Sequence, residues 1–375
     1  MQLHEIMSPF NRAALRVARL SAGFAVFGFG GAVARAQGTD ERPDVIIAMP
    51  AVTEAVTNLA KEVDVNFPVL ETSKKVSAAL RAGLRSGRYN LTSAKGLAAM
   101  LTDDLRKLSG DPHFRVDYFV VPRKFPPDVA GTDPVSEADR TLAFKLQNFG
   151  FARVERLAGN IGYLKLDRFA MPSVAGETAA AAMQFVVGTD ALIIDLRDNG
   201  GGYGAMVTLL ASYFFANPVH LSERTGRAPA DTEQSWTGAV VPGRRYLDKP
   251  VYILSGPRTF SAAEAFAYDL QAQKRAAIVG ETTRGGANTV ARMLLSSRFA
   301  AMVPNARVRN AVTGSNWEGG LKPDVVTSAA LSLPTAYLAA LQAIAPNHRD
   351  DPLTAEIEKG IVSLKAELAA APPRQ

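Results

Sequence analysis

The chain has 375 residues, of which 47% are hydrophobic and 21% charged, and it contains no cysteine. The lack of cysteine excludes disulfide bonds, thiolate metal sites and lipid attachment to a leader cysteine. The formal charge of +6 falls to +3 without the first 36 residues, so charge gives little support for nucleic-acid binding. We expect no metal and no other cofactor.

Residues 1–36 predict a secretory signal peptide. Three arginines precede an apolar stretch at 20–33, and a small-x-small tripeptide ends at Ala36, just before Gln37. The apolar stretch is short and glycine-rich for a membrane-spanning helix. We therefore expect a periplasmic or secreted protein, cleaved near Ala36/Gln37, whose mature chain is not stably inserted in a membrane.

Residues 44–121 predict a small helical bundle that ends in a strand. Apolar residues recur at helical spacing up to residue 109, and breaks at 66–68 and 86–88 indicate about three helices. The segment Phe114–Val121 begins with the alternation typical of a strand. Residues 122–160 are rich in proline at first and predict a linker followed by the start of a sheet.

Residues 161–346 predict an α/β domain. Strands are expected at 161–166, 191–196, 251–254 and 276–279, and helices at 176–187, 205–215 and 261–273. Because the strands are continuous apolar runs separated by helices, they indicate a parallel sheet covered on both faces. Residues 347–375 predict a C-terminal helical tail.

Ser261 is the strongest candidate nucleophile. It stands where the apolar run at 251–254 turns into a helix, so its hydroxyl would lie at the mouth of a sheet beside free backbone N–H groups. Ser261 and Glu264 also have the spacing of a capping box, in which each side chain accepts the other's backbone N–H. From this segment alone, a purely structural cap remains an alternative.

A glycine-rich turn, Asp195-Leu-Arg-Asp-Asn-Gly-Gly-Gly202, follows another buried strand. Consecutive glycines allow positive φ angles and bring backbone N–H groups close to an anion, although the pattern also suits a simple tight turn. Parallel strands end at one edge of their sheet. The N–H groups of Gly201 and Ala262 could therefore form an oxyanion hole, and a contribution from Gly200 is left open.

A serine nucleophile needs a general base, and histidine suits this role because it exchanges a proton near neutral pH. Three of the four histidines lie in the leader or in polar segments, namely His4, His220 and His348. His113 stands in a structured turn before a strand and is the best candidate, against the alternative of a loop histidine bonded to backbone. A carboxylate to orient it is harder to find by spacing. Glu318, between a tryptophan and a Gly-Gly turn, is the candidate, although most acids are simply solvated.

Five motifs together resemble the carboxy-terminal processing (tail-specific) serine peptidase family, above all its branch related to interphotoreceptor retinoid-binding protein and the tricorn protease core. They are Asp111-Pro-His113, Asp195–Gly202, Thr259-Phe-Ser-Ala-Ala-Glu264, Gly280–Asn288 and Asn316-Trp-Glu-Gly-Gly-Leu-Lys-Pro-Asp324. The match runs in order from about residue 45 to about 345. It implies a ClpP/crotonase-like ββα-superhelix domain preceded by a small helical bundle.

The resemblance also implies roles for single residues. Ser261 would be the nucleophile, His113 the base and Glu318 an assisting acid, with the amides of Gly201 and Ala262 as oxyanion donors. The implied substrate is a peptide or unfolded polypeptide.

Three departures from family patterns are visible. Ser-Lys members carry a lysine 25 residues after the serine, where this chain has Gly286, and the nearby Arg284 stays protonated and cannot act as a base. We therefore expect no Ser-Lys dyad. Only about 40 residues separate Val121 from Ile161, too few for a PDZ domain. Pro112 replaces the serine that precedes the histidine in tricorn-like members, so a fourth catalytic residue has no candidate.

These observations predict an exported serine peptidase. The alternative is a non-catalytic carrier of hydrophobic ligands, in which Phe114, Phe260 and Phe266 would line the pocket. A carrier has no need to keep a serine, a histidine and a glutamate together, which favours the peptidase. Acyl-CoA chemistry, a third option, is disfavoured by export.

Overall fold

The computed structural model describes residues 42–123 and 141–371, Ala143 excepted. The predicted signal peptide and most of the proline-rich segment lie outside these residues. The chain divides into Met1–Arg42 and Pro43–Gln375, and the fold described below is that of the second unit.

Three helices open the described chain and confirm the predicted bundle: α1 (Met49–Asn66), α2 (Leu70–Arg85) and α3 (Ala94–Ser109). Their apolar stripes share one core, which includes Val56, Leu59, Leu80, Leu97 and Leu101. Helix α3 begins at Ser93, whose hydroxyl accepts the N–H of Gly96 at 2.8 Å, and ends at Gly110 in the left-handed conformation (φ 77°).

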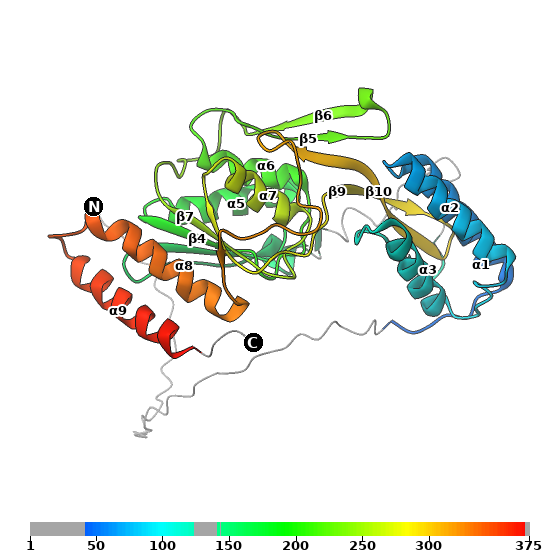
Figure 1. Ribbon diagram of the computed structural model, residues 1–375, viewed down its shortest axis with the longest axis horizontal. Coiled ribbons are helices and arrows are strands. Elements are labelled where there is room, and N and C mark those ends of the chain that lie inside the picture. Colours follow the sequence, from blue (N-terminus) through cyan, green and yellow to red (C-terminus); the bar gives the residue numbers. More distant parts are fainter. Residues whose placement is uncertain (1–41, 124–140, 143, 372–375) are drawn as a thin grey trace, which may run out of the picture. The chain divides into compact units, whose positions relative to one another are not determined.

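A five-stranded antiparallel sheet, which the sequence patterns did not predict, adjoins the bundle. Its strands are β1 (Arg115–Tyr118), β5 (His220–Thr225), β6 (Thr232–Trp236), β9 (Asn288–Leu294) and β10 (Phe299–Asn310). They are ordered β1-β10-β5-β6, and β9 also pairs with β10 (Figure 1). Phe299, Ala301 and Val303 of β10 belong to the same core as the three helices. The strand expected at 114–121 is thus the short β1, an edge of this sheet.

The predicted parallel sheet is confirmed, with six strands in the order β11-β8-β7-β4-β3-β2. They are β2 (Phe151–Leu157), β3 (Ile161–Leu166), β4 (Ala191–Asp195), β7 (Val251–Ser255), β8 (Ala277–Gly280) and β11 (Val325–Val326). All neighbours are parallel except β2, which runs antiparallel to β3 at one edge.

Helices cover both faces of this sheet (Figure 1). On one face, α5 (Pro172–Val186), α6 (Gly204–Ala211) and α7 (Ala262–Ala272) share a core with Leu164, Leu192 and Ile194. On the other, α8 (Ala329–Ile344) and α9 (Thr354–Ala370) share a core with Tyr163, Ala191 and Ile193. Alternate residues of β3 and β4 therefore serve opposite cores, as the two-residue repeat of a strand requires.

Helix α9 agrees with the predicted helical tail, whereas α8 had no prediction. With its continuation to Asn347, α8 is by length and composition the one helix in the described chain that could cross a membrane. It lies on the sheet, and Ala336, Ala340 and Leu341 are buried there. Short 3-10 turns complete the fold at Asn148–Gly150, Ser212–Phe214, Pro229–Asp231 and Ala345–Asn347.

Candidate active site

The glycine-rich turn and the serine turn meet at one edge of the parallel sheet. They follow β4 and β7, which are neighbouring parallel strands. The N–H of Phe260 donates to the carbonyl of Asn199 at 3.0 Å. A Cβ atom on Gly201 would lie 2.9 Å from Cβ of Ser261, so the two turns can approach this closely only because residue 201 is glycine.

Ser261 occupies a strained backbone conformation, with φ 56° and ψ −117°. Non-glycine residues rarely adopt such angles, and they cluster at functional sites where the surrounding fold enforces them. The capping box with Glu264 is formed, and the Glu264 carboxylate accepts the Ser261 N–H at 2.7 Å. The cap and the nucleophile position are thus compatible, because the Ser261 hydroxyl also lies 3.1 Å from Nε2 of His113.

His113 is held by Asp111, the second residue after the end of α3. One oxygen of Asp111, Oδ1, accepts the backbone N–H of His113 at 2.8 Å and lies 3.0 Å from Nδ1 of its ring. The other, Oδ2, accepts the side-chain amide of Asn288 at 2.7 Å. Asp111 and His113 are both buried, so the serine, the histidine and this aspartate form a continuous chain of polar contacts.

The electrostatics of Asp111 decide which ring nitrogen of His113 carries the proton. Burial raises the pKa of Asp111, but the hydrogen bond from the His113 ring, the charge of that ring and the Asn288 amide together outweigh burial and hold the pKa below its usual value. An ionised carboxylate can only accept hydrogen bonds, so the Nδ1 proton points to Asp111. Nε2 is then left to accept the proton of the Ser261 hydroxyl.

Gly286 lies directly against the histidine. A Cβ on Gly286 would stand 2.8 Å from Cε1 of His113 and 2.3 Å from Cε2 of Phe260. The rings of His113 and Phe260 pack with their centroids 4.5 Å apart. Trp317 fixes this loop, because its ring N–H donates to the Gly286 carbonyl at 2.7 Å.

Glu318 lies apart from this chain of contacts. Its backbone N–H donates to the side chain of Asn316 at 3.0 Å, and its side chain is exposed. It lines a small hollow together with Asp111 and Pro112. The acid in contact with His113 is Asp111. It belongs to the Asp-Pro-His motif, but the sequence patterns assign it no role. The available signal was local, since an aspartate often accepts the backbone N–H two residues later.

A second buried carboxylate, Glu264, contacts the serine turn. Besides the Ser261 N–H, it accepts the N–H of Gly285 at 2.7 Å and the hydroxyl of Thr283. Burial raises the pKa of Glu264 to about 7, and these hydrogen bonds oppose the rise. Glu264 therefore connects the serine turn to the loop that carries Gly286.

The predicted oxyanion donors differ in their hydrogen bonding. The Gly201 N–H donates to the side chain of Asn199 at 2.8 Å. Within the described residues, the N–H groups of Ala262 and Gly200 have no such partner. Ala262 is the first residue of α7, where the helix leaves its N–H groups free.

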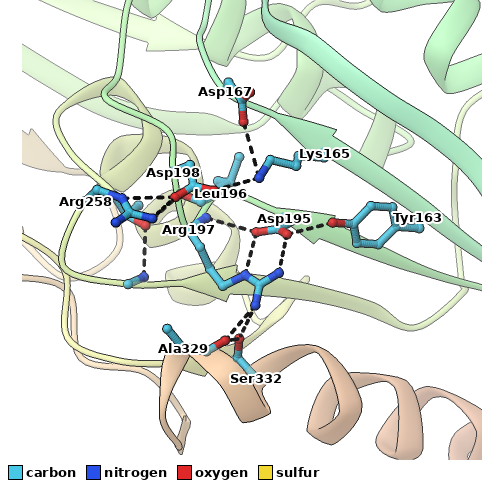
Figure 2. A network of polar contacts seen from close by, with 12 residues as sticks. Tyr163, Lys165, Asp167, Asp195, Leu196, Arg197, Asp198, Arg258, Ala329 and Ser332 are labelled. Carbon is cyan, nitrogen blue, oxygen red and sulfur yellow. Dashed lines mark hydrogen bonds and ion pairs between the residues drawn. The ribbon is translucent and has the colours of Figure 1, made fainter. Parts of the chain in front are cut away.

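A polar network, drawn in Figure 2, connects the glycine-rich turn to neighbouring elements. Arg197 makes two hydrogen bonds to the buried carboxylate of Asp195, at 2.9 and 2.6 Å, and donates to the Ala329 carbonyl of α8 at 2.6 Å. The carboxylate of Asp198 accepts a hydrogen bond from the Lys165 ammonium at 2.6 Å and forms an ion pair with Arg258 of the serine turn. The two turns are therefore tied to each other and to the opposite layer of helices.

A cleft of about 690 Å³ opens beside Ser261 along helix α7, and we call it the α7 cleft. Ser261, Ala262, Ala265 and Asp269 of the α7 segment form one wall. The other walls come from the antiparallel sheet, from α6 and from the glycine-rich turn, and they include Gly202, Leu221, Val308 and the nearby Trp317.

The aromatic residues expected to line a carrier pocket lie elsewhere. Phe114 stacks on Phe67 inside the core of the bundle, and Phe266 is fully buried in the core of the parallel sheet. Phe260 packs against His113. For Phe114 and Phe266 the pocket interpretation is wrong, because both side chains fill the protein interior. In the described residues, His, Asp and Glu side chains form no group of three or more that could hold a metal.

Comparisons with known proteins cover most of the chain. Residues 160–327 match the model of peptidase family S41, and residues 41–143 match the model of the N-terminal domain of this family in eukaryotic IRBP. A carboxyl-terminal-processing protease of Synechocystis is 30% identical over 128 residues. That alignment covers 34% of this chain and 28% of the relative, so the chain matches little more than a quarter of its length.

Two solved structures show the same fold at low sequence identity. A lipoprotein from Streptococcus agalactiae has a TM-score of 0.51 at 14% identity, covering 81% of this chain and 98% of that one. A mutant of CPAF has a TM-score of 0.50 at 12% identity, covering 74% of this chain and 93% of that one. The expected fold, a ClpP/crotonase-like domain preceded by a helical bundle, is confirmed.

Proposed function

Because the chain belongs to peptidase family S41, we propose that it is a serine peptidase whose nucleophile is Ser261. The observation that carries this proposal is the 3.1 Å contact between the Ser261 hydroxyl and Nε2 of His113, with Asp111 on the opposite side of the ring. A nucleophile, a base and an orienting acid in one chain of hydrogen-bond contacts is the arrangement that activates a serine.

In the reaction, Nε2 of His113 takes the hydroxyl proton while the Ser261 oxygen bonds to the carbonyl carbon of a peptide. The negative charge moves to the carbonyl oxygen, where the free N–H of Ala262 can donate to it, together with an amide of the glycine-rich turn. His113 then gives its proton to the leaving amine, and the acyl group stays on Ser261. Water, deprotonated by His113, releases the acid and restores the serine.

In the glycine-rich turn, Gly200 is a second possible donor because its N–H has no hydrogen-bond partner among the described residues, whereas the Gly201 N–H already donates to Asn199. Use of the Gly201 amide would require it to leave that acceptor. The close approach of Gly201 to Ser261 still makes this glycine necessary to the geometry.

We assign the orienting role to Asp111. Its contact with Nδ1 of His113 and its low pKa support a carboxylate that stabilises the protonated imidazole. The assisting role that the resemblance implies for Glu318 stays a prediction. Replacing Asp111 and Glu318 one at a time by their amides distinguishes the two assignments.

A histidine base, rather than a lysine, fits the surroundings of the serine. Residue 286 has no side chain, and the ring of His113 stands where a side chain would extend. The proposal therefore includes a Ser-His-Asp mechanism without a Ser-Lys dyad.

We further propose that the protein is exported and acts on peptides or unfolded polypeptides. The three-part pattern of residues 1–36 supports export. The family and the open α7 cleft beside the serine support a polypeptide substrate.

Digestion of an unstructured protein and of a peptide library by the chain without residues 1–36 tests this function. Cleavage by the wild type and none by Ser261→Ala is the expected result. Cleavage that survives in Ser261→Ala would remove the serine from the mechanism. Absence of cleavage combined with binding of hydrophobic ligands would favour the carrier instead.

A further inference from the structure

A buried carboxylate, Asp269, faces the α7 cleft at a distance from the nucleophile. It lies eight residues after Ser261 on the same side of α7 as Ala262 and Ala265, and its exposed fraction is 1%. Eight residues of helix rise by about 12 Å. Ser261 and Asp269 therefore mark two ends of one wall of the cleft.

Asp269 has little to balance its charge. Its Oδ1 accepts the side-chain amide of Asn310 at 2.8 Å. Within the described part of the chain, its second oxygen has no hydrogen-bond partner, and no lysine, arginine or histidine lies within 4 Å of it. Burial raises the pKa of Asp269 to about 7, and the Asn310 hydrogen bond opposes the rise. A buried carboxylate without a cation is costly to the fold, whereas an amide would pack equally well.

The walls between these two ends suit a long side chain with an apolar stem. Ala265, Val207, Leu221 and Val308 line the cleft. The methylene stems of lysine and arginine lie favourably along such surfaces while their charged ends reach a polar partner. At the rim, Arg224 and Glu233 pair with each other at 2.6 Å and are more exposed than Asp269.

The position of the cleft identifies which substrate residue it receives. In the proposed reaction, the attacked carbonyl is held between the Ser261 hydroxyl and the Ala262 N–H, and both of these residues line the cleft. His113, which protonates the leaving amine, is outside the set of lining residues. The side chain that enters the cleft therefore belongs to the residue that contributes the carbonyl.

We propose that the α7 cleft binds the side chain of the substrate residue that contributes the attacked carbonyl, and that Asp269 selects arginine or lysine there. This inference rests on the proposed serine peptidase function and adds the substrate class to it. An ionic hydrogen bond to Asp269 supplies the selection, and the negative charge of Asp269 disfavours a substrate carboxylate.

The test uses two peptides that differ only in arginine or citrulline before the cleaved bond, since citrulline keeps the shape of arginine and lacks its charge. We expect kcat/KM of the wild type to favour arginine by about 10- to 100-fold. Asp269→Asn keeps an acceptor for Asn310 and is expected to reduce that ratio to within about twofold of unity. Glu358→Gln, at an exposed acid of α9 outside the cleft lining, is the control and is expected to retain the preference.

The controls separate this inference from the function on which it rests. Labelling of Ser261 by a fluorophosphonate reports the active serine without using the cleft selectivity. Labelling together with equal rates for arginine and citrulline, or with a preference unchanged in Asp269→Asn, would overturn the inference and leave the function standing. No labelling and no cleavage of any peptide would overturn both. If Asp269→Asn does not fold, the arginine-to-citrulline ratio of the wild type decides alone.

Discussion

The ring of His113 occupies the space that a side chain on Gly286 would need, because a Cβ there would lie 2.8 Å from Cε1 of the ring. The base and the glycine are therefore coupled, and the loop at 283–288 must stay free of a side chain at this one position. The same added atom would overlap Phe260, which packs against the imidazole.

Replacing Gly286 by alanine is expected to displace His113 from Ser261. A misplacement of about 1 Å at a reacting group costs on the order of 100-fold in rate, so we expect kcat to fall by that amount. Overpacking should also lower the free energy of unfolding by about 1–3 kcal/mol. Steady-state kinetics and urea denaturation measure both effects. Gly188→Ala is the control, since nothing lies within 4 Å of a Cβ there. Equal activity of the two variants would contradict the coupling.

Replacing each of the two candidate acids by its amide should lower kcat by very different amounts. We expect Asp111→Asn to reduce kcat by about 10³- to 10⁴-fold, because the amide no longer stabilises the protonated ring or holds its Nδ1 proton. Glu318→Gln should stay within about twofold of the wild type, since its side chain is exposed. Kinetics on one peptide, with circular dichroism to verify folding, measures both variants. A larger loss in Glu318→Gln would return the acid role to the residue that the resemblance indicated.

The salt bridge between Arg197 and Asp195 should matter for stability. Asp195 is buried, and burial raises its pKa, but the hydrogen bonds and charge of Arg197 outweigh this rise and lower the pKa, so Asp195 stays ionised. Removing its partner in Arg197→Met leaves a buried charge and is expected to cost about 3–5 kcal/mol in the free energy of unfolding. Arg309→Met, which breaks an exposed pair with Glu223, should cost less than about 1 kcal/mol. Urea denaturation curves of both variants decide, and similar losses would show that the network in Figure 2 adds little.

Glu264 should give stability an unusual pH dependence. Burial raises its pKa to about 7 from 4.5, so the folded protein binds this proton more tightly than the unfolded chain does. Its contribution is complete below pH 4.5 and is lost as the pH rises through about 7. Relative to Glu264→Gln, the wild type is expected to lose on the order of 3 kcal/mol of unfolding free energy across that window. Denaturation measured at several pH values checks this, and parallel curves for the two proteins would argue against a raised pKa.

The site residues that could be predicted from the sequence are those at junctions between a predicted helix and a predicted strand. Ser261 follows an apolar strand and precedes a helix, and His113 follows a helix and precedes a strand. Asp111 stands two residues before His113, but the resemblance assigns the acid role to Glu318 in the late motif, so the sequence assigns Asp111 no role. Trp317, next to that acid, proved to hold the Gly286 loop.

The antiparallel sheet could not be predicted from local pattern. Strand β10 pairs with its neighbour in the sequence, β9, but also with β1 and β5, which come from distant parts of the chain. In β5 only Leu221 is fully buried, so the alternation that identifies a half-buried strand is weak. Helix α8 contains Pro334, a residue that usually interrupts helices. The α7 cleft is lined by α6, by α7 and by strands of the antiparallel sheet, so its lining emerges only from the tertiary fold.

The central claim is that Ser261 is a nucleophile activated by His113, and labelling with a fluorophosphonate tests it most directly. We expect the wild type to form one adduct, located on Ser261 by mass spectrometry of its peptides, at a rate that falls at least 100-fold in His113→Ala. Ser261→Ala should give no adduct, with folding of both variants verified by circular dichroism. An adduct on another residue, or equal labelling of wild type and His113→Ala, would contradict the account.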